Sequence, residues 1–532
     1  MDEVSTGNTV TPTLSDEAVR KPGGAAKTVS KNVVISLARV VFNSLVALVL
    51  PAYLTHRLPV ATYGAWVLIL QLGAFVLFLD LGIQTGVSKF VAEHNARGDV
   101  GAAGRHASAG FAMMTMASLL GLVLTLILAW QVPRLFHSMP EALYRDVRIS
   151  VLLVGASLSF VLLCSVFSGV FMGLQQYGVP TAITILNRGL YTLAVCIVVY
   201  FQGSLMAMGA AVALINVSTS LLQALAWRRK LSHIRISLRG VDPKILKQMF
   251  GYCFTLAVWS AAMLCISGLD VTIVGHYDFK ETAYYSLATL PANLIMAILA
   301  STLGPMLPAA SALSTQRTPV AMGNILFRIS RYSTIVMLLT GLPLLAGGYP
   351  ILRLWVGATY ALHSVRYLQV LVLATILRNL CMPYATVVVA TGKQKLATAS
   401  AIAEAVVNLG SSIYLARSLG AIGVAAGTLL GAFVSVAMHF TFSMHYTYST
   451  ILISRIRLFV GSLLRPALIA IPSLLFLPMW RNSSWQPLSL PLWLFWATAT
   501  LLIAWFGALN ADERTSLLGI IGSRIKLPVQ QR

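Results

Sequence analysis

The chain has 532 residues, of which 57% are hydrophobic and 10% are charged, and its mean hydropathy is +0.80. These values exclude a soluble globular protein and indicate a chain that lies largely within a lipid bilayer. The formal net charge of +22 could suggest a nucleic-acid partner. However, the Lys and Arg residues are spread over many short connecting segments, which is typical of membrane topology, so no nucleic-acid binding is expected.

The chain begins with a polar tail. Residues 1–31 are rich in Ser, Thr and Gly, carry four acidic side chains, and contain no apolar core followed by a cleavage site. This composition predicts a disordered cytoplasmic tail and no secretory signal peptide.

Fourteen apolar segments follow, each close to the roughly 20 residues that a helix needs to cross about 30 Å of hydrocarbon. The expected spans are residues 33–54, 63–88, 108–130, 149–173, 179–201, 204–226, 249–275, 283–309, 329–350, 367–390, 396–416, 420–444, 457–479 and 489–509. The sequence therefore predicts an all-α polytopic membrane protein with about 14 transmembrane helices.

A basic stretch divides the first six spans from the next six. We expect an N-lobe at 32–227, a basic cytoplasmic linker at 228–248, a C-lobe at 249–445, two further spans at 446–510, and a cytoplasmic tail at 511–532. If the spans alternate from a cytoplasmic N-terminus, 25 of the 38 Lys and Arg residues fall on the cytoplasmic side and 9 on the opposite side. This positive-inside bias predicts that both termini are cytoplasmic. It also predicts attraction to anionic membrane lipids.

The two groups of six spans share a few residues at similar positions. Two pairs are separated by 220 residues and two by 219; they are His56 and His276, Thr62 and Thr282, Gly173 and Gly392, and Gln175 and Gln394. We interpret these matches as a duplication in which the two lobes are related by a pseudo-two-fold axis along the membrane normal, with a cavity between them.

The five cysteines give no sign of a disulfide framework or a metal site. All lie in or at the edge of apolar segments, and none shows a paired spacing in a loop. They are Cys164, Cys196, Cys253, Cys265 and Cys381. We expect no metal and no cofactor.

Seven ionisable residues fall at the depth of the membrane, where an unpaired charge costs roughly 3 kcal/mol near a helix centre. They are Arg39, Asp80, Arg188, Asp270, Arg378, Glu404 and Arg465. Such residues normally face a water-filled cavity or a partner of opposite charge. Arg465 is close enough to a span end to reach the interface, and Asp270 is expected to be interfacial.

Arg39, Arg188 and Arg378 predict a cationic cavity for an anionic headgroup, since the planar guanidinium donates paired hydrogen bonds to phosphate. The alternative is a set of structural ion pairs, for example Arg188 with Glu404. Asp80 and Glu404 are candidates for ion coupling or pairing. Five amides could bind sugar hydroxyls or bond between helices; they are Asn43, Gln71, Asn187, Asn293 and Asn408.

Span 2 and the loop after it carry the most recognisable motif. Residues 63–99 begin with Tyr-Gly-x-Trp, contain Asp-Leu-Gly-Ile at 80–83, and close with Ala-x-Gly-Asp. This segment resembles the bacterial flippases for O-antigen and exopolysaccharide repeat units. That family belongs to the multidrug, oligosaccharidyl-lipid and polysaccharide exporter superfamily, which includes the peptidoglycan-precursor flippase. The resemblance is densest over residues 30–100, and the span count extends it over most of the chain.

The resemblance implies two six-helix lobes around a V-shaped cavity that opens alternately to each side, with Arg39 and Arg188 best placed to make it cationic. It implies a transporter of the bacterial inner membrane that flips a polyprenyl-diphosphate-linked oligosaccharide from the cytoplasmic to the periplasmic leaflet. A polysaccharide polymerase and chain-length machinery are the partners it suggests.

Two other functions stay open. A multidrug or organic-cation antiporter of the same superfamily should have an acidic cavity, whereas the residues at membrane depth are four Arg and three acids. The other is a membrane-embedded polysaccharide polymerase, glycosyltransferase or acyltransferase, of which the first two should carry catalytic acids in a large outward loop. The longest outward loops, 131–148 and 351–366, hold only Glu141 and Asp146. His56 and His276 could act as acyltransfer bases, but we expect no enzymatic activity.

Overall fold

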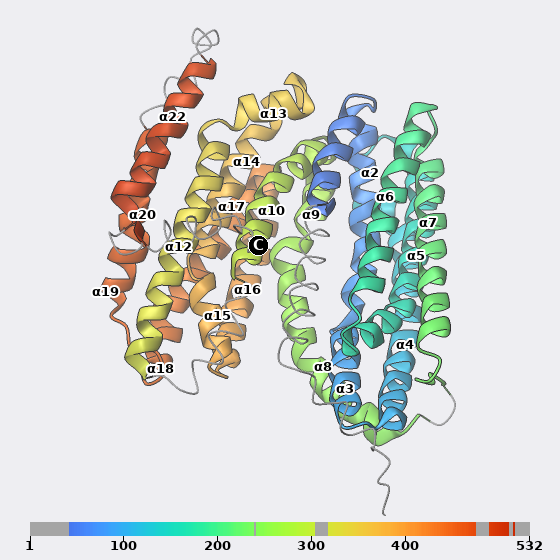
Figure 1. Ribbon diagram of the computed structural model, residues 1–532. Helices are drawn as coiled ribbons and strands as arrows, with labels where there is room; N and C mark the ends of the chain where they lie inside the picture. The colour runs from blue at the N-terminus through green and yellow to red at the C-terminus, as the bar shows by residue number, and fades with distance from the viewer. Residues whose placement is uncertain (1–41, 239–240, 304–317, 475–488, 510–513, 516–532) are drawn as a thin grey trace, which may run out of the picture.

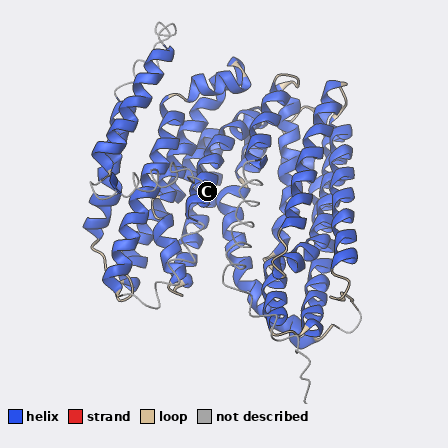
Figure 2. Ribbon diagram, in the orientation of Figure 1, coloured by secondary structure: helices blue, strands red, loops and turns tan. Residues whose placement is uncertain are grey.

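The computed structural model of the protein describes residues 42–238, 241–303, 318–474, 489–509 and 514–515. Nearly all of these residues are helical, and they include no strand (Figure 2). Twelve helical segments in these ranges are long and apolar enough to cross a membrane, and two shorter apolar helices lie at Phe42–Thr55 and Trp493–Ala508. The predicted all-α membrane fold is therefore confirmed, with twelve full-length spans and two shorter apolar helices where fourteen spans were expected.

The N-lobe starts with the Phe42–Thr55 helix. Its other elements are α2 (Val60–Ala74), the 3₁₀ segment η2 (Phe75–Asp80), α3 (Ile83–Ala96), α4 (Val100–Leu135), α5 (Glu141–Gly173), α6 (Gly178–Tyr200) and α7 (Leu205–Lys230).

The C-lobe contains more interruptions. Its elements are α8 (Pro243–Met263), the π segment η3 (Leu264–Gly268), α9 (Asp270–Tyr277), η4 (Phe279–Glu281), α10 (Thr282–Leu303), α12 (Pro319–Ala346), α13 (Gly348–Val356), α14 (Ala358–Asn379), α15 (Met382–Ala390), α16 (Gln394–Leu419), α17 (Ala421–Met438), η5 (His439–Ser443) and α18 (Met444–Thr447). The C-terminal spans comprise α19 (Arg455–Leu458), η6 (Phe459–Leu464), α20 (Arg465–Ala467), η7 (Leu468–Ala470), α22 (Ser489–Ile503) and η9 (Ala504–Ala508).

The two lobes lie side by side, with the span formed by α8, η3 and α9 between them (Figure 1). This span serves both lobes: α8 packs against α3 and α4 of the N-lobe and against α16 of the C-lobe, and η3 also packs against α16. The C-terminal spans lie on the far side of the C-lobe, where η6 and α20 pack against α12 (Figure 1). The residue boundaries that we assign to the lobes stay predictions.

Two N-lobe helices are longer than the sequence predicted. α4 has 36 residues, which corresponds to about 54 Å at 1.5 Å per residue, and α5 begins at Glu141 inside the expected 131–148 loop. The Asp99 side chain caps α4 by accepting the Ala102 N–H at 2.7 Å. Hydropathy marks only the part of a helix within the hydrocarbon. The loops before and after α4 are therefore shorter than expected.

Several spans that the sequence indicated as continuous are broken, and spans 2 and 7 are the two that bear on the site. In span 2, Leu81 and Gly82 have φ values of 47° and 77°, and α3 restarts with the Asp80 carboxylate accepting the Gln84 N–H at 3.1 Å. A side chain at position 82 would meet Leu256 of α8, with a contact of 2.5 Å from the added Cβ. Glycine suits this position because it tolerates a positive φ and has no side chain to clash with Leu256. In span 7, the π segment η3 ends at Gly268, two residues before Asp270.

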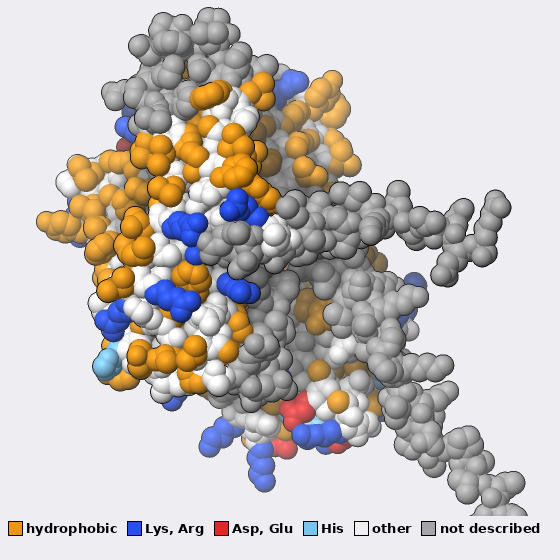
Figure 3. Space-filling model, turned by 60° about the vertical axis from the view of Figure 1, so that its left-hand side comes forward, with side chains coloured by type: hydrophobic (Ala, Val, Ile, Leu, Met, Phe, Trp, Pro, Cys, Tyr) orange, Lys and Arg blue, Asp and Glu red, His pale blue; other side chains and the backbone are white. Residues whose placement is uncertain are grey.

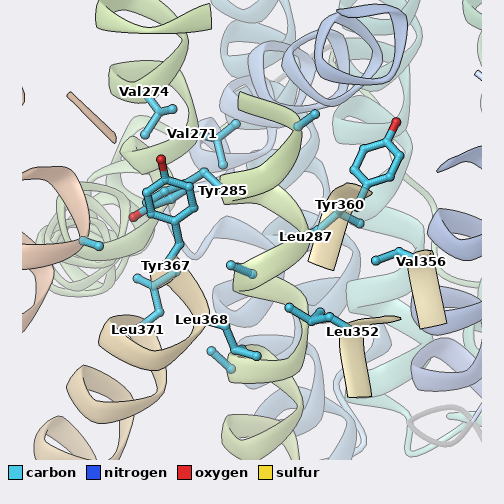
Figure 4. Close-up of a cluster of buried hydrophobic side chains, with 14 of the residues drawn as sticks. Val271, Val274, Tyr285, Leu287, Leu352, Val356, Tyr360, Tyr367, Leu368 and Leu371 are labelled. Atoms are coloured by element: carbon cyan, nitrogen blue, oxygen red, sulfur yellow. The ribbon is translucent and has the colours of Figure 1, made fainter. Parts of the chain in front are cut away.

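The lobes contact each other at the end of the molecule that carries α13, which is the outer side in the predicted topology. Trp355 Nε1 donates to the Leu48 carbonyl at 2.7 Å, and the Phe279 N–H donates to Ser138 Oγ at 3.2 Å. The largest buried cluster continues from this seam into the C-lobe. Figure 4 shows part of this cluster, in which the rings of Tyr285 and Tyr367 lie side by side with centroids 5.6 Å apart.

The turns after α5 and α15 have the same hydrogen-bond pattern. The N–H groups of residues 174, 175 and 176 donate to carbonyls four, three and five residues earlier, and those of residues 391, 392 and 393 do the same. Gln175 and Gly392 occupy the same place in this pattern, with φ values of 58° and 78°. The structural offset is therefore 217 residues rather than 219. The duplication itself stays a prediction.

Candidate functional site

A cavity of about 680 Å³ lies between the N-lobe helices and the span-7 and span-8 helices of the C-lobe. Its walls come from the Phe42–Thr55 helix, α2, η2, α5, α6, α7, α9 and α10. Much of the lining is apolar, as is usual for ligand sites, and a limited set of polar side chains supplies specificity. The amides among them are Gln71, Asn187, Asn216, Gln223 and Asn293.

Arg188 is the one charged residue among the described residues that line this cavity. It lies on α6 one turn before Tyr191, and its Cζ is 5.5 Å from the centroid of that ring. The side chain is exposed to the cavity, and no ion pair to it occurs among the described residues. The cavity therefore presents a cation whose charge no neighbouring carboxylate neutralises.

A hydrogen-bond network joins the polar faces of α5, α6 and α7. Asn187 Nδ2 donates to Asn216 Oδ1 at 3.2 Å and to Thr219 Oγ1 at 2.8 Å. Asn216 Nδ2 in turn donates to Ser157 Oγ at 3.0 Å. Asn187 thus holds helices together while also lining the cavity; contact with a glycan stays a prediction.

Four polar residues of α7 were missed by the sequence analysis. They line the cavity and follow the i, i+3, i+4, i+7 spacing that places residues on one helix face; they are Asn216, Thr219, Ser220 and Gln223. That spacing was a usable signal, because a polar stripe along a span is expected to face protein or water rather than lipid.

The other predicted amides have different positions. Gln71 lines the cavity, and its Nε2 donates to the Gly268 carbonyl in the π segment of span 7. Asn293 also lines the cavity. Asn408 is fully buried in the C-lobe, where its Nδ2 donates to the Ile266 carbonyl at 2.9 Å. Asn43 is on the Phe42–Thr55 helix but not in the cavity lining.

Arg378 and Glu404 form an ion pair within the C-lobe and do not line the cavity. Their side chains are 20% and 5% exposed. The alternative pair of Arg188 with Glu404 is therefore not formed, because α16 presents Glu404 to α14 rather than to α6. Asp80, the other coupling candidate, caps α3 through Gln84.

The interfacial position expected for Asp270 is wrong. This residue begins α9, is 6% exposed, and accepts hydrogen bonds from Tyr285 Oη at 3.4 Å and Thr428 Oγ1 at 3.3 Å. It is buried because span 7 breaks just before it and turns the carboxylate toward α10 and α17. Arg39 lies outside the described residues. No group of three or more residues suited to hold a metal occurs in the part of the chain that the structure describes.

Comparisons with solved structures show which fold surrounds this cavity. An inward-facing multidrug resistance MATE family transporter of the MOP superfamily is similar with a TM-score of 0.63 and 16% identity, over 78% of this chain and 98% of that one. The lipid II flippase MurJ in an inward closed conformation is similar with a TM-score of 0.65 and 12% identity, over 86% and 99%. An outward-facing MATE transporter gives a TM-score of 0.56 at 16% identity, over 79% and 95%. At these identities the likeness shows the fold alone.

Family models match two parts of the chain, whereas no curated protein matches it. The MatE model matches residues 256–414. The model described as "Polysaccharide biosynthesis protein" matches residues 29–314, which is more than half of the chain and includes every helix that lines the cavity. The chain therefore belongs to the polysaccharide biosynthesis protein family and has the fold of the MOP superfamily.

Proposed function

We propose that the protein flips a polyprenyl-diphosphate-linked oligosaccharide repeat unit from the cytoplasmic to the periplasmic leaflet of a bacterial inner membrane, for O-antigen or exopolysaccharide synthesis. The observation that carries this proposal is Arg188, the sole charged group in the described cavity lining and one without a carboxylate partner there. A guanidinium in that position suits a diphosphate, because its planar fork donates paired hydrogen bonds to phosphate oxygens.

The rest of the lining suits the glycan. The amides of Gln71 and Asn293 and the hydroxyls of Thr184, Ser220 and Thr289 can donate to and accept from sugar hydroxyls. The volume of about 680 Å³ falls within the roughly 300–1,000 Å³ typical of ligand sites. A cavity of this size accommodates a headgroup, while the prenyl chain remains in the surrounding lipid.

A second candidate is an antiporter for organic cations, which the MatE match over residues 256–414 favours. A cationic substrate would need a carboxylate or an unopposed aromatic cage in the cavity, since an arginine repels it. The described lining holds no Asp or Glu. The charge of the cavity therefore favours the anionic substrate.

The test replaces the cavity cation. Arg188→Ala should abolish translocation of a fluorescent polyprenyl-diphosphate glycan in proteoliposomes and polymer export in cells, at unchanged membrane abundance. Arg188→Lys should keep part of the activity, because the charge survives while the paired hydrogen bonds do not. Arg353→Ala serves as a matched control, since Arg353 is exposed and lies outside the cavity lining.

Two results would contradict the proposal. One is full translocation by Arg188→Ala at normal abundance. The other is measurable efflux of organic cations by the wild-type protein that increases in the Arg188→Ala variant. That result would support the antiporter. The proposal also includes the topology, with both termini in the cytoplasm. It includes a polymerase and chain-length machinery as partners.

A further inference from the structure

The C-terminal part of the chain has a marked excess of positive charge. Between residues 282 and 511 the sequence contains a single acidic residue, Glu404, and Glu404 is paired with Arg378. Spans 9, 13 and 14 carry no Asp or Glu. Four arginines lie on the helices of spans 9 and 13; they are Arg328, Arg331, Arg457 and Arg465.

These arginines come together where span 13 packs on α12. The Cζ atoms of Arg331 and Arg457 lie 4.6 Å and 5.3 Å from the centroid of the same ring, that of Phe327. Arg331 Nε also donates to the carbonyl of Gly461 at 3.0 Å. Arg328 is three residues before Arg331 and so lies on the same side of α12.

Arg465 extends this group along span 13. It follows Arg457 by two helical turns, is exposed, and donates from Nε to the Gly507 carbonyl at 3.0 Å. Figure 3 shows the face on which the C-terminal spans lie, where Lys and Arg side chains are grouped among hydrophobic ones. We call Arg328, Arg331, Arg457 and Arg465 the flank cluster.

The flank cluster lies on two helical segments that are long and apolar enough to cross a membrane, Pro319–Ala346 and Arg455–Leu474. Arg328 and Arg331 both belong to the first half of α12. Arg331 is twelve residues after Pro319, the first residue of α12, which places it about 18 Å along the helix. Arg331 is also 2% exposed.

The direction of the side chains indicates which leaflet they reach. In a helix, each Cα–Cβ bond tilts toward the N-terminus. Spans 9 and 13 both start on the cytoplasmic side in the predicted topology, so their arginines extend toward the cytoplasmic headgroup layer. Long arginine side chains commonly reach an interface in this way.

We propose that the flank cluster binds the phosphate of an anionic phospholipid of the cytoplasmic leaflet, with the acyl chains against the apolar surface of α12 and span 13. The charge excess supplies the attraction, and Arg457 and Arg328 are the exposed cations that reach the headgroup. The flank cluster is separate from the transport cavity, since α12, α19, η6 and α20 contribute no residue to the cavity lining. A resident phospholipid, rather than the transported substrate, is therefore its occupant.

The test compares lipids and variants with the purified full-length protein in detergent. Native mass spectrometry should show tighter binding of phosphatidylglycerol than of phosphatidylcholine with the same chains. Each Arg near a headgroup contributes about fivefold in affinity, so Arg328→Gln with Arg457→Gln should weaken phosphatidylglycerol binding by about 30-fold. The control is Arg228→Gln with Arg229→Gln, which removes the same charge from the exposed end of α7 and should leave the affinity nearly unchanged.

The outcomes separate a specific site from general attraction. Replacing Arg328 and Arg457 by Lys should retain most of the affinity, because the charges remain. Equal losses in the flank and α7 variants would overturn the proposal, as would equal binding of the two phospholipids. Displacement of phosphatidylglycerol by a lower concentration of undecaprenyl diphosphate would also overturn it, by identifying the substrate as the occupant.

Discussion

The ion pair between Arg378 and Glu404 ties α14 to α16, and removing one partner should destabilise the protein more than removing both. Asp270 lies close enough to Arg378 for their charges to attract. With all three groups ionised their net charge is −1. Arg378→Gln changes it to −2 and Glu404→Gln to 0, whereas the double variant restores −1. Arg378→Gln should therefore be the more damaging single change.

The expected size follows from burial. Breaking a buried ion pair by removing one partner costs about 3–5 kcal/mol. The Arg378 side chain is 20% exposed, so we take the lower figure. An unfolding entropy of about 2.1 cal/mol/K per residue amounts to about 1.1 kcal/mol/K for 532 residues, so a loss of about 3 kcal/mol lowers Tm by about 3 °C. The double variant should recover most of this loss, since two neutral amides leave no uncompensated charge in the pair.

Gel filtration of detergent-solubilised protein after heating measures these shifts, and membrane abundance in cells gives a second readout. The matched control is Arg97→Gln, which breaks an exposed pair with Glu93 whose side chains are 65% and 40% exposed. Pairs of this kind contribute about 0.3–0.5 kcal/mol, so the control should barely change Tm. A shift for Arg378→Gln no larger than that of Arg97→Gln would refute the reasoning. So would a double variant less stable than either single variant.

Three further predictions concern packing, topology and energetics. A Cβ added at Gly427 of α17 would lie 2.4 Å from Ser412 Oγ and 2.5 Å from Ser412 N, so Gly427→Ala should cost about 1–3 kcal/mol of stability. Gly410→Ala meets no atom within 4 Å and should have the opposite sign, because alanine is the better helix former; equal effects of the two changes on Tm would contradict the packing. A cysteine at His233 should react with an impermeant thiol reagent only after cells are opened, and one at Glu141 already in intact cells; the reverse pattern would invert the topology. A diphosphate diester carries about two charges, so moving it outward through 100 mV should release about 4.6 kcal/mol. Translocation in vesicles should then run on the potential alone, and dependence on a pH gradient with no effect of the potential would exclude this mechanism.

Hydropathy predicted the order of the spans, and their number only approximately, because each needs a long apolar run; it could not locate the breaks within them. The average over a window of about 20 residues hides a short irregular segment such as Leu264–Gly268. One break had a local signal, since the Asp-Leu-Gly sequence at 80–82 combines a helix-capping side chain with a glycine suited to positive φ. The break before Asp270 also has a glycine and an Asp nearby, Gly268 and Asp270, but Gly268 is not among the residues with positive φ and α9 has no side-chain cap. The residue types alone therefore did not locate this break, and the position of that carboxylate was misjudged.

The sequence could not distinguish the roles of Arg188 and Arg378, because each lies well inside an apolar span. What differs is the helix that each side chain faces. Arg378 meets Glu404 on α16, 26 residues further along the chain, whereas Arg188 stacks on Tyr191 of its own helix and faces the cavity. Successive residues of a helix point in directions about 100° apart around its axis. The partner of a buried charge therefore depends on how the helix is rotated and packed, which hydropathy does not encode. The cost of an unpaired charge is met in opposite ways at the two positions: by a carboxylate at Arg378, and at Arg188 by the cavity that an anionic substrate would enter.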